Sequence, residues 1–388
     1  MYILATIVAM KSKYRVYADY AATTPTDKEV ADAMLPYFTQ FYGNPSSKHA
    51  FGLEAQDAIT KSSITIAGYL NCSPEEIFYT SSGTESNNMA ITGVAKAMKN
   101  IGKHIITTEI EHPSIINTVR ALEREGWLVT YLKVGKDGLV NPKDFKKAIT
   151  KNTVLATIHL SNNEIGVIQP IKELTTIAHK HKIIFHTDAC QSIAHMPVNI
   201  QDLGVDLLSF NGAKIYGPKG IAVLYIKEGT PIFPIIYGGG QQKSLRSGTE
   251  NVAGIAGLAK AIELIDKNLK KDSKRERKYR DCLEDRFMEL KNIKINAQKS
   301  PRVPNLTSVT VLGVDARSLL DELNGSGIAI SAGAACNSKS QTSSHVLKTI
   351  GLTDDEANST IRVSLGRYST SKDCDLIFEA IKNFVSSK

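Results

Sequence analysis

Residues 205–220 read VDLLSFNGAKIYGPKG, and this stretch decides the fold and indicates the chemistry. Its first half is a short apolar run of the kind that forms a buried strand, and its second half sets Lys214 among small residues and glycines. In an open α/β sheet, ligands bind beyond the carboxyl ends of such strands. A surface lysine needs no such setting, so Lys214 is a candidate reactive amine.

Further β-branched runs flank this stretch and alternate with segments that have the period of a helix, such as residues 171–181. The runs are KHIITTEI (103–110), TVLATIHL (153–160), KIIFHTDA (182–189) and IAVLYI (221–226). Alternation of this kind predicts a mostly parallel sheet covered by helices. After a long helix that begins near residue 252, strands and helices follow in an order that predicts a smaller α+β domain, with a boundary near residue 270. These later segments are 306–314, 315–324, 359–366 and 372–385.

The composition excludes several other classes of protein. The chain has 388 residues, 42% of them hydrophobic, which is enough for two domain cores. Its five scattered cysteines contain no CxxC pair, so we expect neither a disulfide framework nor a zinc site, and a reducing, cytoplasmic setting. The apolar residues 1–10 are too short for a membrane span and lack the basic start of a signal peptide, so a tail or an added edge strand is expected.

The net charge of +8 is spread along the chain. Its densest part, KNLKKDSKRERKYR at 267–280, mixes acidic and basic residues at helical spacing. This pattern favours a solvated helix face over a surface that binds nucleic acid or a partner protein. We therefore expect no direct binding to nucleic acid and none to a membrane.

Two further loops that leave predicted strands carry residues suited to a cofactor. Gly83 and Thr84 precede a helix, where free backbone N–H groups bind phosphate, although ordinary helix capping explains the same residues. Asp188 ends an apolar strand, with Gln191 three residues later; its carboxylate suits a protonated pyridine nitrogen or a simple capping role. Lys214 ends the next strand, where a desolvated amine can form a Schiff base.

In combination, the motifs resemble those of the cysteine desulfurases, pyridoxal-phosphate enzymes of the aminotransferase class V group with the fold-type I architecture. The shared motifs are DYAATTP (19–25), YGNPSSKHAFG (42–52), TSSGTESNN (80–88), EHPSI (111–115), NNEIGVIQPI (162–171), DACQS (188–192), KIYGPKG (214–220), RSGTEN (246–251), SAGAACNS (331–338) and IRVSLGR (361–367). The resemblance implies a large domain with a mostly parallel, seven-stranded sheet and a smaller α+β domain. It divides the chain into an N-terminal segment at 1–23 that joins the small domain, a cofactor domain at 24–270 and a small domain at 271–388.

The resemblance also implies the roles of individual residues around pyridoxal 5′-phosphate. Lys214 forms the Schiff base and Asp188 holds the pyridine nitrogen. His112 stacks on the ring and acts as acid and base around the thiol steps. Asn163 and Gln191 contact the ring hydroxyl side, and Asn163 also lies at the substrate.

The remaining implied contacts hold the two anionic ends of the ligands. Gly83 and Thr84 bind the cofactor phosphate, together with Thr249 from the neighbouring subunit of a homodimer. Arg362 binds the carboxylate of the substrate L-cysteine, since its guanidinium can donate two parallel hydrogen bonds.

Cys336 distinguishes a desulfurase from its aminotransferase relatives. It lies in SAGAACNSKSQTSSHVL (331–347), a stretch of small and polar residues that predicts a long surface loop. The resemblance implies that its thiolate attacks the sulfur of L-cysteine, which leaves alanine and a persulfide on Cys336. A long loop implies delivery of this sulfur to an acceptor such as an iron–sulfur scaffold or a tRNA-thiolation protein.

One position departs from the family pattern. The residue before the Schiff-base lysine is usually a histidine that helps to hold the phosphate, and this chain has Ala213. Asn211, where serine is common, is a substitute donor. The departure leaves two readings open: an active enzyme, favoured by the presence of Lys214, Asp188 and the other site residues, and a weakened paralogue that serves as a scaffold for sulfur transfer. Among enzymes, the alternative is a selenocysteine lyase.

Overall fold

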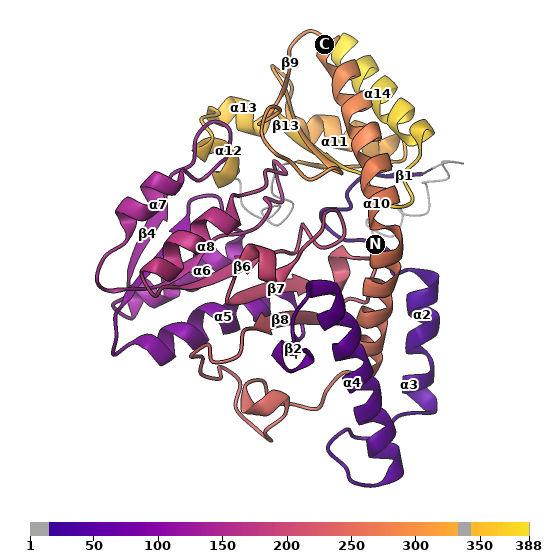
Figure 1. Cartoon of the computed structure of the whole chain (residues 1–388). Helices are drawn as coiled ribbons and strands as arrows, with labels where there is room; N and C mark the ends of the chain where they lie inside the picture. The colour runs from indigo at the N-terminus through magenta and orange to yellow at the C-terminus, as the bar shows by residue number, and fades with distance from the viewer. Residues whose placement is uncertain (1–14, 333–342, 388) are drawn as a thin grey trace, which may run out of the picture.

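The computed structural model describes residues 15–332 and 343–387 of the chain. Cys336, expected on a surface loop, and residues 1–10, expected to form a tail or an edge strand, lie outside these ranges. Figure 1 shows a large body built on a seven-stranded sheet and a smaller body above it, with the long helix α10 (Val252–Met288) running through both. Among the described residues, no helix is both long and apolar enough to cross a membrane.

The large sheet has the strand order β2-β8-β7-β6-β5-β3-β4. Strands β4, β3, β5, β6 and β7 pair in parallel, and β8 runs antiparallel to both of its neighbours. The bounds are β2 (Ile77–Thr80), β3 (His104–Thr108), β4 (Leu128–Leu132), β5 (Thr153–Thr157), β6 (Ile184–Asp188), β7 (Leu207–Asn211) and β8 (Ala222–Ile226). The mostly parallel, seven-stranded sheet expected from the sequence is confirmed.

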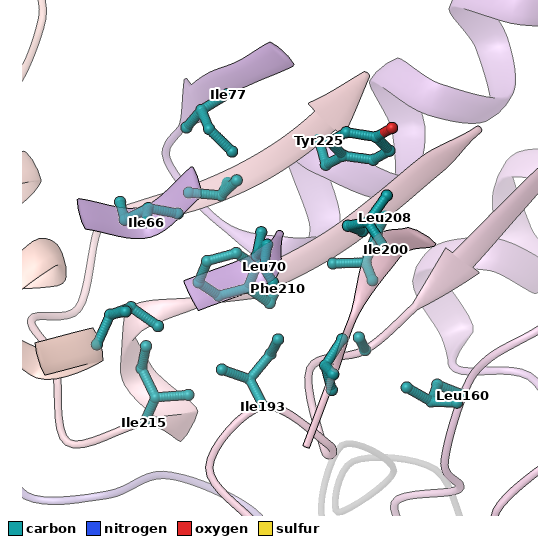
Figure 2. Packing of buried hydrophobic residues seen from close by; sticks show 14 of the residues in the cluster. Ile66, Leu70, Ile77, Leu160, Ile193, Ile200, Leu208, Phe210, Ile215 and Tyr225 are labelled. Atoms are coloured by element: carbon teal, nitrogen blue, oxygen red, sulfur yellow. The ribbon is translucent and has the colours of Figure 1, made fainter. Parts of the chain in front are cut away.

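Helices cover both faces of this sheet, which explains why its strands read as apolar runs. On β2, Ile77 and Tyr79 pack with α4 and α10, whereas Phe78 between them packs with α5 and α6, because successive side chains of a strand point to opposite faces. Figure 2 shows part of the first core, which includes Leu70 of α4 and Phe210 of β7. The helices of this body are α2 (Lys28–Met34), α3 (Pro36–Thr39), α4 (Ala50–Leu70), α5 (Gly83–Met98), α6 (Pro113–Arg124), α7 (Pro142–Ala148), α8 (Ile171–Lys180) and α9 (Ile200–Leu203).

The smaller body contains an antiparallel sheet in the order β12-β13-β10-β9. Its strands are β9 (Ile293–Ile295), β10 (Leu306–Val311), β12 (Ser331–Ala332) and β13 (Thr360–Ser364). Its helices are α11 (Ala316–Gly325), α12 (His345–Thr349), α13 (Asp354–Asn358) and α14 (Ser371–Ser386). Near the start of the described chain, β1 (Val16–Tyr17) pairs in parallel with β11 (Ile328–Ala329), so both ends of the sequence meet in this body.

Helix α10 contributes to both cores. From Val252 to Ile265 its buried face is apolar and packs in the core of the large body, whereas Leu283 and Phe287 pack in the core of the smaller one. Between and beside these segments the helix buries one charged side chain per turn. We call this row the α10 seam: Asp272, Glu276, Arg280 and Glu284. The boundary predicted near residue 270 falls inside this continuous helix.

The prediction of a solvated helix face at 267–280 is therefore wrong for the seam. The seam residues find partners far away in the sequence, such as His195, Arg302 and Arg367, which local spacing does not reveal. The opposite face does meet solvent. Its exposed basic residues are Lys267, Lys270, Lys271, Lys274, Arg277 and Lys278.

Candidate functional site

A pocket of about 420 Å³ lies at the carboxyl ends of β5, β6 and β7, beside the starts of α5 and α6. Most residues singled out from the sequence line it, namely Gly83, Thr84, His112, Asn163, Asp188, Gln191, Asn211, Lys214 and Arg362. Thr249 is not among the residues that line this pocket, and Cys336 lies outside the described residues. The topology explains the convergence, because the loops that follow parallel strands meet at one edge of the sheet.

Lys214 ends the short 3₁₀ turn η2 (Gly212–Lys214), which follows β7 directly. The turn is tight, because a Cβ atom at Gly212 would lie 2.4 Å from the carbonyl oxygen of Pro218. The ammonium group of Lys214 donates hydrogen bonds to the carbonyl oxygens of Ala21, at 2.8 Å, and of Ala22. The glycines of the opening stretch thus bring the chain close to itself and direct the amine into the pocket.

Asp188 is buried at the end of β6. Burial alone would raise the pKa of its carboxyl group, but the nearby His112 and the hydrogen bonds to the carboxylate together outweigh this effect, and the pKa lies below its ordinary value. Hydrogen bonds from the backbone N–H of Cys190, at 2.9 Å, and from Nδ2 of Asn87, at 2.7 Å, act in the same direction. A buried anion in a pocket wall suits a cationic ring nitrogen.

His112 is the N-cap of α6, and its Nδ1 accepts a hydrogen bond from the backbone N–H of Ser114 at 3.1 Å. Burial lowers the pKa of His112, and the nearby Lys214 lowers it further, against the opposing effects of Asp188 and Glu111. The pKa of His112 therefore lies below its ordinary value, which favours the neutral form of the imidazole. A neutral, buried imidazole suits both ring stacking and proton transfer at a thiol.

The first turn of α5 forms an anion cradle at the other end of the pocket. A Cβ atom at Gly83 would lie 2.9 Å from Sγ of Cys190 and 3.0 Å from Nδ2 of Asn211, so only glycine fits here without a shift of these neighbours. The backbone N–H groups of a first turn lack partners within their helix and attract anions. Nδ2 of Asn211 lies 3.3 Å from Sγ of Cys190, and its Oδ1 is buried without a hydrogen-bond partner among the described residues. Ala213 also lines the pocket and adds no polar side-chain group.

Arg362 enters the pocket from β13 of the smaller body and is buried. Two of its guanidinium nitrogens donate to Oδ1 of Asp19, at 2.7 Å, and to the carbonyl oxygen of Asn163, at 2.9 Å. Its Nε is buried and has no hydrogen-bond partner in the described part of the chain. Arg362 is thus held in place by two contacts and has a donor left for a ligand.

Sequence reasoning missed several residues of the pocket wall. Asn87, which holds Asp188, and Glu164, which lies beside Arg362, both fall inside quoted motifs but were assigned no role. His159 and its partner Glu111 were missed as well. Their positions just after β5 and β3, at the same edge of the sheet as Asp188, were the signal that could have found them.

The fold and the pocket together define a class of protein. A lysine after one parallel strand and a buried aspartate at the end of the neighbouring strand, with an anion cradle close by, form the arrangement of pyridoxal-phosphate enzymes of the aminotransferase type. The family described as aminotransferase class-V matches residues 16–377. This chain belongs to the aminotransferase class-V family, whose members in general depend on pyridoxal phosphate.

Named relatives show which members of this family the chain is similar to. It is 45% identical over 374 residues to "Cysteine desulfurase IscS" of Dictyoglomus turgidum, with 96% of this chain and 95% of the relative covered. Among solved structures, a "NifS-like protein" has a TM-score of 0.91 and 36% identity, covering 97% of this chain and all of that one. The structure titled "SspA in complex with cysteine" has a TM-score of 0.79 and 35% identity, covering 92% and 100%. The resemblance to cysteine desulfurases found in the sequence motifs is confirmed.

Proposed function

We propose that this protein is a cysteine desulfurase that converts L-cysteine to L-alanine and passes the sulfur through Cys336 to an acceptor protein. The observation that carries the proposal is the gathering of Lys214, Asp188, His112 and Arg362 around one pocket. The names of the relatives support the same activity, and one structural relative is titled as a complex with cysteine. Cys336 supplies the thiol that an aminotransferase does not need.

The residues of the pocket fit pyridoxal 5′-phosphate. When bound, this cofactor supplies an electron sink for the bonds around the α-carbon of the substrate. Asp188 would hold the ring nitrogen, Gly83 and Thr84 the phosphate, and Lys214 the carbonyl carbon. Oδ1 of Asn211, which is buried without a hydrogen-bond partner among the described residues, supports a polar ligand at this wall.

The other site residues bind the substrate and move its protons. Arg362 donates from Nε to the carboxylate of L-cysteine, and the carbonyl oxygen of Asn163 keeps the guanidinium in place. Lys214 accepts the α-proton and later returns it to carbon. His112, whose neutral form is favoured by burial, accepts the thiol proton. The thiolate of Cys336 bonds to the substrate sulfur as the carbon–sulfur bond breaks, so the products are L-alanine and a persulfide.

We also propose that the active form is a homodimer in which Thr249 serves the phosphate site of the partner subunit. Large apolar side chains are exposed around α3 and the start of α4, including Leu35, Phe38, Phe51 and Leu53. A patch of this kind on a protein surface is typical of an interface. Sedimentation combined with an activity assay tests this, and a fully active monomer would contradict it.

The acceptor of the sulfur is proposed to be an iron–sulfur scaffold or a tRNA-thiolation protein in the cytoplasm. The reaction requires a reduced thiol at Cys336, which a cytoplasmic setting provides.

Replacement of Cys336 by serine tests the proposed function. The Cys336→Ser protein should bind pyridoxal 5′-phosphate with its yellow colour and change its absorbance on addition of L-cysteine, but release no sulfide under reductant. Cys282→Ser is the matched control, because Cys282 is exposed on α10 and does not line the pocket. Normal sulfide release by Cys336→Ser would overturn the assignment of the nucleophile.

A further inference from the structure

A second imidazole lines the pocket and is not used in the chemistry above. His159 follows β5, between the strand that ends in Asp188 and the strand that leads to His112. Its side chain is buried, and its Nδ1 lies 3.1 Å from Oε2 of Glu111. The backbone N–H of His159 donates to both carboxylate oxygens, at 3.2 and 3.0 Å.

Glu111 in turn is completely buried and held from the other side. The hydroxyl of Thr108 donates to Oε1 of Glu111 at 2.7 Å, so the carboxylate cannot rotate away from the imidazole. A buried carboxylate is costly unless it is hydrogen-bonded, and the imidazole of His159 is its side-chain neighbour at 3.1 Å. The pair therefore directs the Nδ1–H of His159 toward Glu111 and leaves Nε2 on the opposite side of the ring.

The Nε2 atom of His159 is buried and has no hydrogen-bond partner among residues 15–332 and 343–387. The other histidines buried in the large sheet are satisfied. His104 contacts Thr153 and Thr130, and His186 contacts Thr157 and Ser209, with both ring nitrogens engaged in each case. A buried polar group without a partner costs about 1–3 kcal/mol. An unsatisfied nitrogen in the wall of a ligand pocket indicates that the ligand completes it.

We propose that His159 is a further cofactor-contacting residue whose Nε2 forms a hydrogen bond with the ring oxygen of bound pyridoxal 5′-phosphate, with Glu111 as its positioning residue. The ring oxygen is the polar group that remains once Asp188 holds the nitrogen, Lys214 the carbonyl carbon and the first turn of α5 the phosphate. Two residues were expected on that side. Gln191 already donates from Nε2 to the carbonyl oxygen of Ala21 at 2.9 Å, and the carbonyl oxygen of Asn163 accepts a hydrogen bond from Arg362 at 2.9 Å. The inference rests on the proposed function, since it names a contact within the same site.

The test compares two ligands on two proteins. Dissociation constants of pyridoxal 5′-phosphate and of its 3-deoxy analogue, which lacks the ring oxygen but keeps the aldehyde and phosphate, are measured by titration of the full-length apoprotein. His159→Asn keeps a side-chain donor near Glu111 and removes Nε2. We expect this variant to bind pyridoxal 5′-phosphate about tenfold or more weakly than the wild type, because a hydrogen bond to a charged group contributes about 1.5–3 kcal/mol. For the 3-deoxy analogue the two proteins should differ less than about twofold.

A matched control comes from the other buried histidine–glutamate pair of the described chain, His195 and Glu276, with Nδ1 and Oε2 2.9 Å apart. Neither residue lines the pocket, so His195→Asn should bind each of the two ligands with the same dissociation constant as the wild type. Glu111→Gln should weaken the binding of pyridoxal 5′-phosphate by part of the factor seen in His159→Asn, and should leave the binding of the 3-deoxy analogue unchanged. Equal losses for both ligands in His159→Asn, or no loss for either, would overturn the inference. A wild-type protein that binds neither ligand would instead overturn the proposed function itself.

Discussion

The pocket and the α10 seam both bury charged side chains, but they differ in how those side chains are satisfied. In the seam, Glu284 and Arg302 form two parallel contacts of 2.8 and 2.7 Å, and both are almost fully buried. Asp272 likewise pairs with Arg367 at 3.0 Å. In the pocket, by contrast, Nε of Arg362 and Nε2 of His159 are buried without partners in the described part of the chain.

This difference shows that buried charge alone does not mark a functional site. The seam joins elements that are distant in the sequence, since Arg367 also reaches Asp27, the N-cap of α2, at 3.2 Å. Among the described residues, no side-chain atom of the four seam residues is buried without a hydrogen-bond partner. A functional site is marked by unsatisfied atoms that surround a cavity, because a ligand then supplies the missing partners.

The largest expected effect lies in the pocket. Lys214→Ala removes both the amine that binds the cofactor and the base that accepts the α-proton, so the rate of alanine formation should fall at least about a thousandfold. The yellow absorbance band should disappear as well. Lys219→Ala is the matched control, because Lys219 bonds to the carbonyl oxygen of Thr24 at 2.8 Å and does not line the pocket. Continued turnover of cysteine by Lys214→Ala would contradict the assignment of Lys214 as the cofactor-binding amine and base.

A seam substitution should instead change stability. Arg302→Met leaves Glu284 as a buried, unpaired charge, and we expect the free energy of unfolding to fall by about 3–5 kcal/mol. Urea unfolding measures this loss, and sulfide release at 25 °C in the absence of urea should stay within about twofold of the wild type. The double variant Arg302→Met with Glu284→Met should recover most of the lost stability. A loss of activity in a folded Arg302→Met protein would contradict the view that the α10 seam serves stability and the pocket serves activity.

A third prediction concerns His186, a buried histidine of β6 whose two ring nitrogens both have hydrogen-bond partners. Burial lowers the pKa of His186 from 6.5 to about 4. Between these two values the unfolded chain binds a proton that the folded protein does not, so stability is full above pH 6.5 and decreases as the pH falls toward 4. At about 1.4 kcal/mol per unit of pKa, the loss is on the order of 3 kcal/mol.

Urea unfolding of the apoprotein between pH 7 and pH 4 measures this effect. In His186→Asn the free energy of unfolding should fall less steeply as the pH decreases, because the contribution of His186 is absent. The contributions of the other titratable groups remain. If the variant and the wild type lose stability in parallel across this range, His186 is not the group responsible.

The smallest expected effect tests the position at which this chain departs from its family. Ala213→His should add one donor to the phosphate cradle and tighten the binding of pyridoxal 5′-phosphate by about tenfold, while sulfide release still depends on Cys336. Cofactor titration of both proteins under the same conditions is the measurement. Equal dissociation constants would mean that Asn211 already replaces the missing imidazole. The phosphate end of the pocket would then lack no hydrogen-bond donor.

Much of the pocket could be predicted because its residues lie where parallel strands end. Gly83, Asp188 and Lys214 each follow a strand recognisable from its apolar run, and the topology of the sheet brings those ends together. The contact between Arg362 and Asp19 was not predictable in this way. It joins the two ends of the chain through the small body, and no local pattern records such a pairing.

The sequence by itself determined the alternation of strands and helices, the edge of the sheet at which ligands bind and the residue types that carry the chemistry. These features depend on short-range periodicity and on the conformational freedom of glycines such as Gly212. Only the tertiary structure decided which charges are satisfied: that the mixed-charge helix at 267–280 buries a row of ion pairs, and that His159 retains an unpaired nitrogen beside the pocket. Satisfaction of a buried polar group depends on partners brought together by packing, and these lie from tens to hundreds of residues away along the chain.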